Sequence, residues 1–168
     1  MAKFTAKPQV AFADATKMAF QKCVTFSGRS RRSEFWWAEL ALVIISVIGN
    51  LIPYVGGLVS IFVALINLSM FFRRLHDTGR SGWWIGVPTI LGCILVIFVI
   101  STVGVKMLSG QGDLSNLDNI GYSNIAIIGI LYIVTGILQL IVIIFCCLDS
   151  DPSTNKYGES PKYILEAE

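Results

Sequence analysis

The sequence predicts an all-α membrane protein: four transmembrane helices preceded by a short N-terminal amphipathic helix at the membrane interface. Two observations support this prediction. Hydrophobic residues make up 54% of the 168 residues and charged residues only 14%, whereas about 25% of an ordinary soluble domain is charged. Long apolar segments also follow one another along the chain, and about 20 such residues cross the hydrocarbon core of a bilayer as a helix.

The predicted transmembrane helices are four apolar segments, at residues 36–52, 55–72, 83–105 and 120–148. The last three contain no charged residue, and the first contains only Glu39. Asn50, Pro53, Gly56 and Gly57 predict a tight reversal, which makes the first two segments an antiparallel hairpin.

The remaining segments are polar. Residues 106–119 are predicted to form a mobile outer loop. At 149–168 the composition changes to that of a polar tail. We expect the whole chain, 1–168, to form a single membrane domain.

The segment at residues 9–24 predicts the amphipathic helix. Apolar or small residues recur there with helical spacing, at Phe12, Ala15, Thr16, Ala19, Phe20 and Cys23. Asp14, Lys17 and Gln21 occupy the opposite face. Such a helix either lies on the cytoplasmic leaflet with its lysines toward the lipid headgroups or packs on the protein's own cytoplasmic face.

Lysine and arginine are distributed unevenly, which predicts the orientation. They cluster before the first segment and between the second and third, at Lys3, Lys7, Lys17, Lys22, Arg29, Arg31, Arg32, Arg73, Arg74 and Arg80. Positive segments stay cytoplasmic, so both termini are expected on that side. Tryptophan pairs at the same side are expected to anchor the interface: Trp36, Trp37, Trp83 and Trp84.

Much of the charge is thereby brought into one cytoplasmic layer. We expect an anion- or lipid-binding cap, or a purely structural one, built from Arg29, Arg31, Arg32, Arg73, Arg74, His76, Asp77 and Arg80. Arginine binds phosphate through paired hydrogen bonds, and phospholipid headgroups are the nearest abundant anions. The alternative is that these charges set topology and pair with one another. A carboxylate inside a span needs a partner, so we predict a salt bridge from Glu39 to Arg73 or Arg74.

Several kinds of site are not expected. His76 and Asp77 are adjacent, so on a helix they point about 100° apart and form no catalytic dyad. The four cysteines (Cys23, Cys93, Cys146, Cys147) have no metal-binding spacing. The net charge of +2 suggests no nucleic-acid partner. We expect no catalytic residue, no metal and no cofactor.

Three strings in order, FSGRSRRSEFWW, FFRRLHDTGRSGWW and STNKYGESPK, resemble those of the domain of unknown function 805 family of small bacterial inner-membrane proteins. The resemblance runs from about Phe12 to Lys162 and singles out Gly28, Arg29, Arg32, Phe35, Trp36, Arg73, Arg74, Leu75, His76, Asp77, Arg80, Trp84, Asn155, Tyr157, Gly158 and Pro161. It implies a compact four-helix protein of the bacterial inner membrane, and it supplies no activity. We expect the tail motif Asn155, Tyr157 and Gly158 to pack on the arginine layer.

Three functions follow from these expectations. The first is a non-enzymatic module whose arginine cap binds anionic phospholipid or a phosphate-bearing ligand, and which assembles with itself or a membrane partner. The second is an oligomeric channel or small transporter lined by Asn67, Ser69 and Gln139. The third is an intramembrane enzyme that uses His76 and Asp77.

Overall fold

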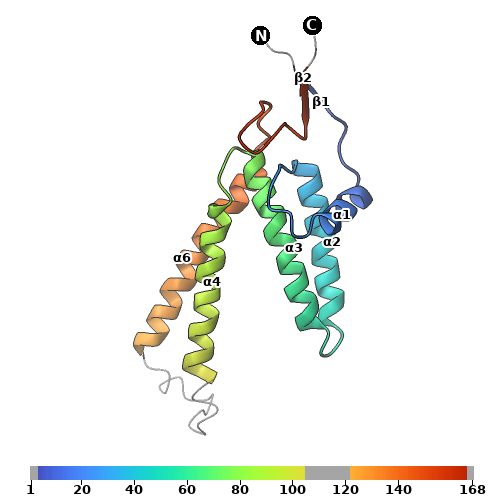
Figure 1. Ribbon diagram of the computed structural model, residues 1–168. Helices are drawn as coiled ribbons and strands as arrows, with labels where there is room; N and C mark the ends of the chain where they lie inside the picture. Colours follow the sequence, from blue (N-terminus) through green and yellow to red (C-terminus); the bar gives the residue numbers. More distant parts are fainter. Residues whose placement is uncertain (1–3, 105–121, 166–168) are drawn as a thin grey trace. The chain divides into compact units, whose positions relative to one another are not determined.

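The computed structural model describes residues 4–104 and 122–165 of the chain (Figure 1). Its elements, in order, are β1 (Phe4–Ala6), α1 (Phe12–Gln21), α2 (Arg32–Asn50), α3 (Gly56–Asp77), α4 (Trp83–Val99), the π-helical turn η1 (Ile100–Gly104), α6 (Tyr122–Cys147) and β2 (Tyr163–Leu165). The loop expected at 106–119 lies outside the described residues. The chain forms two compact units, Met1–Trp83 with Ile144–Glu168, and Trp84–Ile143. The single membrane domain expected over 1–168 stays a prediction.

Four helical stretches are long and apolar enough to cross a membrane: Arg32–Asn50, Gly56–Asp77, Trp83–Thr102 and Asn124–Cys147. They confirm the four helices that the sequence predicts. The main difference lies at the charged ends. Helix α2 begins at Arg32 and α3 continues to Asp77, so much of the charge lies on the terminal turns of these helices instead of in loops.

Helices α2 and α3 form an antiparallel hairpin in the first unit (Figure 1). Near one end the rings of Phe35 and Phe71 meet edge to face, with centroids 5.0 Å apart. Near the reversal Gly49 allows close approach, because a β-carbon there would lie 2.6 Å from a methyl group of Val59. These two contacts fix which residues of α2 and α3 lie at the same level.

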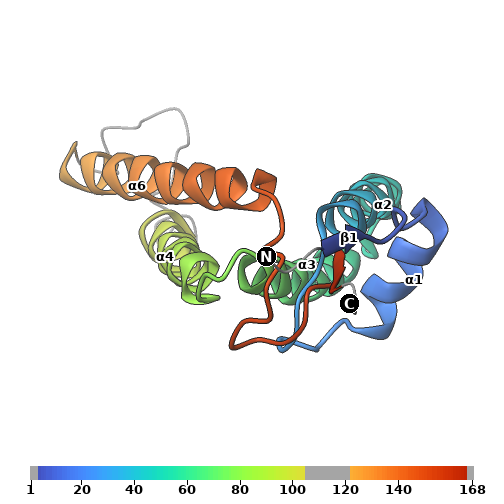
Figure 2. The ribbon, with the colours of Figure 1, turned by 90° about the horizontal axis from the view of Figure 1, so that it is seen from above.

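Helix α1 packs against α2 and α3 (Figure 2). Its small residues Ala15 and Ala19 are buried, and the ring of Phe12 meets that of Trp37 edge to face at 6.0 Å. The ring of Phe20 stacks against Phe62 at 6.2 Å. The helix is therefore held by its own chain in this structure, whereas its position at a membrane interface stays a prediction.

The two ends of the chain are joined by a feature that the sequence did not predict. Strands β1 and β2 pair antiparallel, with Thr5 opposite Ile164, and the pairing continues where the backbone N–H of Lys7 donates to the carbonyl of Lys162 at 2.8 Å. This two-stranded sheet lies beside both termini (Figure 1). It is a small addition to a helical fold, and it ties the tail to the N-terminal segment.

The second unit contains most of α4 and α6. Only 11% of the most apolar stretch of Trp83–Thr102 is buried within the chain, and only 6% of that of Asn124–Cys147. A helix that leaves this much apolar surface uncovered requires lipid or another protein around it. This exposure agrees with the membrane assignment.

Candidate functional site

The Asp77 lock is a buried cluster of four residues: Arg29, Arg74, Asp77 and Ser150. The Asp77 carboxylate is fully buried and forms ion pairs with both arginines, through Arg29 Nε at 3.1 Å and Arg74 Nη1 at 2.5 Å. The hydroxyl of Ser150 donates to the same carboxylate. A buried charge is tolerated when it is paired and its remaining lone pairs are satisfied, and both conditions hold for Asp77.

Arg29 also holds the tail. Its Nη1 donates to the carbonyls of Ser153 at 2.8 Å and Gly158 at 3.1 Å, and its Nη2 donates to the carbonyl of Asp151 at 2.5 Å. The backbone N–H of Asp151 in turn donates to the carbonyl of Asp77 at 3.1 Å. The planar, five-donor guanidinium is suited to binding several carbonyls at once, so Arg29 fixes the tail against the end of α3.

Arg74 makes the equivalent contacts with the end of α6. Its Nε donates to the carbonyl of Cys146 at 3.1 Å, and its Nη2 donates to that of Leu148. The last carbonyls of a helix have no partner within it and carry partial negative charge. Arg74 therefore caps α6 while it neutralises Asp77, and every guanidinium nitrogen of both lock arginines donates to an internal contact.

His76 and the tail motif form a stack beside the lock. The imidazole lies parallel to the ring of Tyr157, with centroids 3.7 Å apart and planes 7° from parallel, and its Nδ1 lies 3.3 Å from the carbonyl of Gly28. Asn155 and Gly158 form a tight turn through reciprocal backbone hydrogen bonds of 3.1 and 3.0 Å. The turn suits glycine because Gly158 has a φ of +124°. His76 and Asp77 face different partners and form no dyad.

Arg73 pairs with Glu34 and not with Glu39. Its Nη1 lies 3.3 Å from Glu34 Oε1, while Arg74 is held by Asp77, so the predicted salt bridge from Glu39 to either arginine is wrong. The physical reason is the register of the hairpin. Glu34 and Arg73 lie at nearly equal distances along the chain from Pro53, whereas Glu39 lies a turn deeper. Counting outward from the reversal identifies the correct pair.

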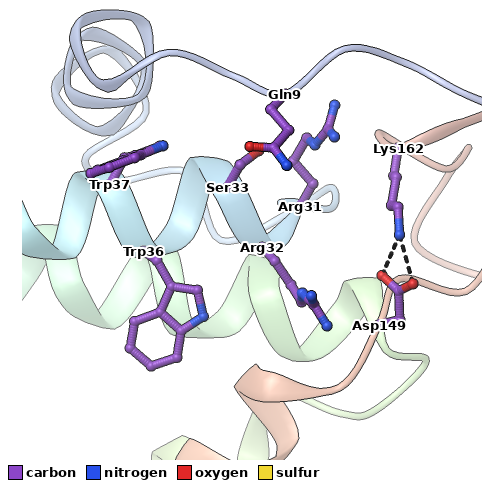
Figure 3. Close-up of a pocket in the computed structure, with 8 residues that line it drawn as sticks. All are labelled: Gln9, Arg31, Arg32, Ser33, Trp36, Trp37, Asp149 and Lys162. Atoms are coloured by element: carbon purple, nitrogen blue, oxygen red, sulfur yellow. Dashed lines mark hydrogen bonds and ion pairs between the residues drawn. The ribbon is translucent and has the colours of Figure 1, made fainter.

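A cavity of about 260 Å³ lies at the start of α2, lined by Gln9, Arg31, Arg32, Ser33, Trp36, Trp37, Asp149 and Lys162 (Figure 3). We call it the headgroup pocket after its two tryptophans, a residue type enriched at the headgroup level of membranes. Arg31 is buried and donates from Nη1 to the carbonyl of Pro8 at 2.6 Å. Arg32 is exposed, and one of its nitrogens donates to the carbonyl of Cys147 at 3.2 Å. Three cations and one carboxylate line the pocket.

The carboxylate of this pocket, that of Asp149, already forms an ion pair within the chain. Lys162 Nζ lies 2.6 Å from both of its oxygens (Figure 3), and the hydroxyl of Tyr163 donates to it at 3.2 Å. The hydrogen bond from Lys162 is the main reason that the pKa of Asp149 falls to about 2. The sequence does not predict this pair, because the two residues become neighbours only where the tail turns back on itself at Asn155–Gly158.

We expect the Asp149–Lys162 pair to stabilise the fold only above acidic pH. A folded-state pKa below the ordinary 3.8 means that the contribution is present above pH 3.8 and is lost as the pH falls through about 2. Asp149 is 50% exposed, so Asp149→Asn should cost less than about 1 kcal/mol at pH 7. Unfolding free energies measured against pH should converge for variant and wild type below pH 4. A difference that grows toward pH 2 would contradict this.

The other predicted site residues lie apart from these clusters. The guanidinium of Arg80 lies over the ring of Phe145 at 4.1 Å, a cation–π contact. Trp36 and Trp37 line the headgroup pocket, and Trp83 and Trp84 begin α4. Within residues 4–104 and 122–165, no group of three or more His, Cys, Asp or Glu side chains is placed to hold a metal ion.

Comparisons with known proteins identify relatives among bacterial inner membrane proteins. The chain is 27% identical over 148 residues to inner membrane protein YhaI of Escherichia coli strain K12 and 26% identical over 151 residues to inner membrane protein YhaH of the same strain. Both alignments cover 83% of this chain and 88% of the relative. No solved structure matches the chain. The model of the family described as "Protein of unknown function (DUF805)" matches residues 23–159, which contain the whole Asp77 lock, and the chain belongs to that family.

Proposed function

We propose that this protein is a non-enzymatic integral module of the bacterial inner membrane that binds an anionic phospholipid in the headgroup pocket. Both termini would lie on the cytoplasmic side. The observation that supports this best is the pocket itself, which places Arg31, Arg32 and Lys162 beside two tryptophans at the first turns of a candidate membrane span. Tryptophan is enriched at the headgroup level of membranes, and arginine matches phosphate geometry.

Two of the arginines expected in a binding cap are unavailable to a ligand. Arg29 and Arg74 are committed to Asp77 and to backbone carbonyls, so they serve as a structural lock. Arg32 differs because it is exposed at the pocket. Within the described residues it makes one hydrogen bond, to the carbonyl of Cys147, which leaves its other N–H groups for a ligand. Binding by this proposal depends mainly on Arg32, with Lys162 shared between Asp149 and the incoming phosphate.

Arg32→Gln tests the proposal. A charge-assisted hydrogen bond contributes about 1.5 to 3 kcal/mol, so the variant should bind short-chain phosphatidylglycerol about 10- to 150-fold more weakly in a detergent thermal-shift titration. Lys156→Gln is the matched control, because it removes one positive charge from a tail residue outside the headgroup pocket. It should titrate like the wild type, and phosphatidylcholine should shift neither protein.

Two results would redirect the proposal. Equal phosphatidylglycerol affinities for Arg32→Gln and wild type would show that the headgroup pocket is not the lipid-binding site. An equal shift with inorganic phosphate alone would indicate a soluble phosphate-bearing ligand in place of a lipid. Assembly with itself or a membrane partner remains part of the proposal. Within the described residues, neither the channel nor the enzyme is favoured by a comparable observation.

A further inference from the structure

Two buried oxygen atoms in the α2–α3 hairpin have no hydrogen-bond donor among the described residues: Glu39 Oε2 and Asn67 Oδ1. An unsatisfied buried acceptor costs about 1 to 3 kcal/mol, and more when it is charged. Both residues lie within helices that are candidate membrane spans, where the cost of a carboxylate is highest. The headgroup pocket and the Asp77 lock include neither residue.

The packing of the hairpin places Glu39 and Asn67 at the same level. Phe35 on α2 and Phe71 on α3 are in ring contact at 5.0 Å. Glu39 follows Phe35 by four residues and Asn67 precedes Phe71 by four, so each lies one helical turn deeper on the same face. Because α2 and α3 are antiparallel, a residue one turn further along α2 lies opposite a residue one turn earlier in α3. The two unpaired oxygens therefore belong to one level of the hairpin.

The charged groups around Glu39 do not neutralise it. On the neighbouring helix Arg73 pairs with Glu34 through Nη1, while its Nε and Nη2 have no hydrogen-bond partner in the described part of the chain and so do not bond to Glu39. Arg74 is paired with Asp77. On the last turn of α6, Cys146 is buried, and a thiol adds no positive charge. Among the residues that the structure describes, no positive charge bonds to either of these two oxygen acceptors.

We propose that Glu39 and Asn67 form a binding site for one monovalent cation, a sodium ion or a proton, within the α2–α3 hairpin. Carboxylate and amide carbonyl oxygens are hard ligands of the kind that alkali ions and protons share. The bound cation neutralises Glu39 and satisfies Asn67 Oδ1 at the same time. This function is separate from lipid binding, since the headgroup pocket contains neither residue.

The test measures the stability of the full chain in detergent at constant ionic strength, with sodium chloride replacing choline chloride. Sodium at about ten times its dissociation constant should raise the unfolding midpoint by about 3 to 6 °C. Glu39→Gln and Asn67→Leu should each abolish the rise. Glu159→Gln is the matched control, because it makes the same chemical change in the exposed tail, and it should respond like the wild type.

Two further measurements distinguish a bound sodium ion from a bound proton. If sodium displaces a proton, its addition in weak buffer releases up to one proton per wild-type chain and none from Glu39→Gln. If the proton alone is bound, sodium has no effect, and the infrared carbonyl band of a protonated carboxylic acid is lost in Glu39→Gln. The proposal is overturned if sodium leaves the midpoint unchanged and Glu39→Gln removes no such band. It is equally overturned if Glu39→Gln keeps the sodium response.

Discussion

Replacing Asp77 with asparagine is expected to lower the free energy of unfolding by about 3 to 5 kcal/mol, because removing one partner from a buried ion pair leaves the other charge uncompensated. Here two guanidinium groups, those of Arg29 and Arg74, share the one carboxylate. Asparagine keeps the size of the side chain but replaces one acceptor oxygen with a donor that faces other donors. We therefore expect the largest stability loss of any single substitution at the lock.

Denaturant titration in detergent micelles measures this loss. Asp14→Asn is the control, since Asp14 is an exposed residue of α1 and the substitution should stay within about 0.5 kcal/mol of wild type. If Asp77→Asn were as stable as Asp14→Asn, the ion pairs would not hold the charged layer together. In that case the arginines would have to be regarded as determinants of topology alone.

Replacing Arg29 with lysine should release the tail while leaving the helices folded. Lysine keeps the positive charge but offers no planar fork, so it cannot bind Asp77 and the carbonyls of Ser153, Asp151 and Gly158 together. We expect a loss of about 2 to 4 kcal/mol from the broken charge-assisted bonds. Residues after Leu148 should become sensitive to limited digestion by proteinase K.

The matched control for this digestion is Arg80→Lys. Arg80 Nη1 donates to the carbonyl of Thr78, a residue of the link that follows α3, so this substitution should leave the tail protected. Cleavage of the tail at the same rate in both variants, or in neither, would show that Arg29 does not fix it. Circular dichroism should report unchanged helix content in both proteins.

The sequence predicts the helices well because their signal is local. An uncharged apolar segment of about 20 residues needs no tertiary information to be recognised, and the resemblance of three short strings to one family is likewise visible without a structure. The gathering of Arg29, Arg74 and Asp77 also follows from the sequence, since the predicted topology places all three at the same end of the helices.

The contacts within that layer depend on register and could not be read from charge alone. Glu39 was the expected partner because it stands alone in an apolar segment, yet the hairpin places Glu34 opposite Arg73. The Asp149–Lys162 pair forms where the tail turns back on itself, and the pairing of β1 with β2 brings the N-terminal segment beside it. Strands of three residues carry too little pattern to be predicted, and the headgroup pocket was therefore missed as a separate site.

Native mass spectrometry from a mild detergent is the most direct test of phospholipid binding, because one spectrum reports retained lipid and the number of chains together. The wild type should retain anionic phospholipid, and a variant carrying Arg31→Gln and Arg32→Gln should lose it, whereas Lys156→Gln should keep it. A wild type that retains no anionic lipid, or a double variant that retains as much as wild type, would contradict the proposal that the headgroup pocket binds phospholipid.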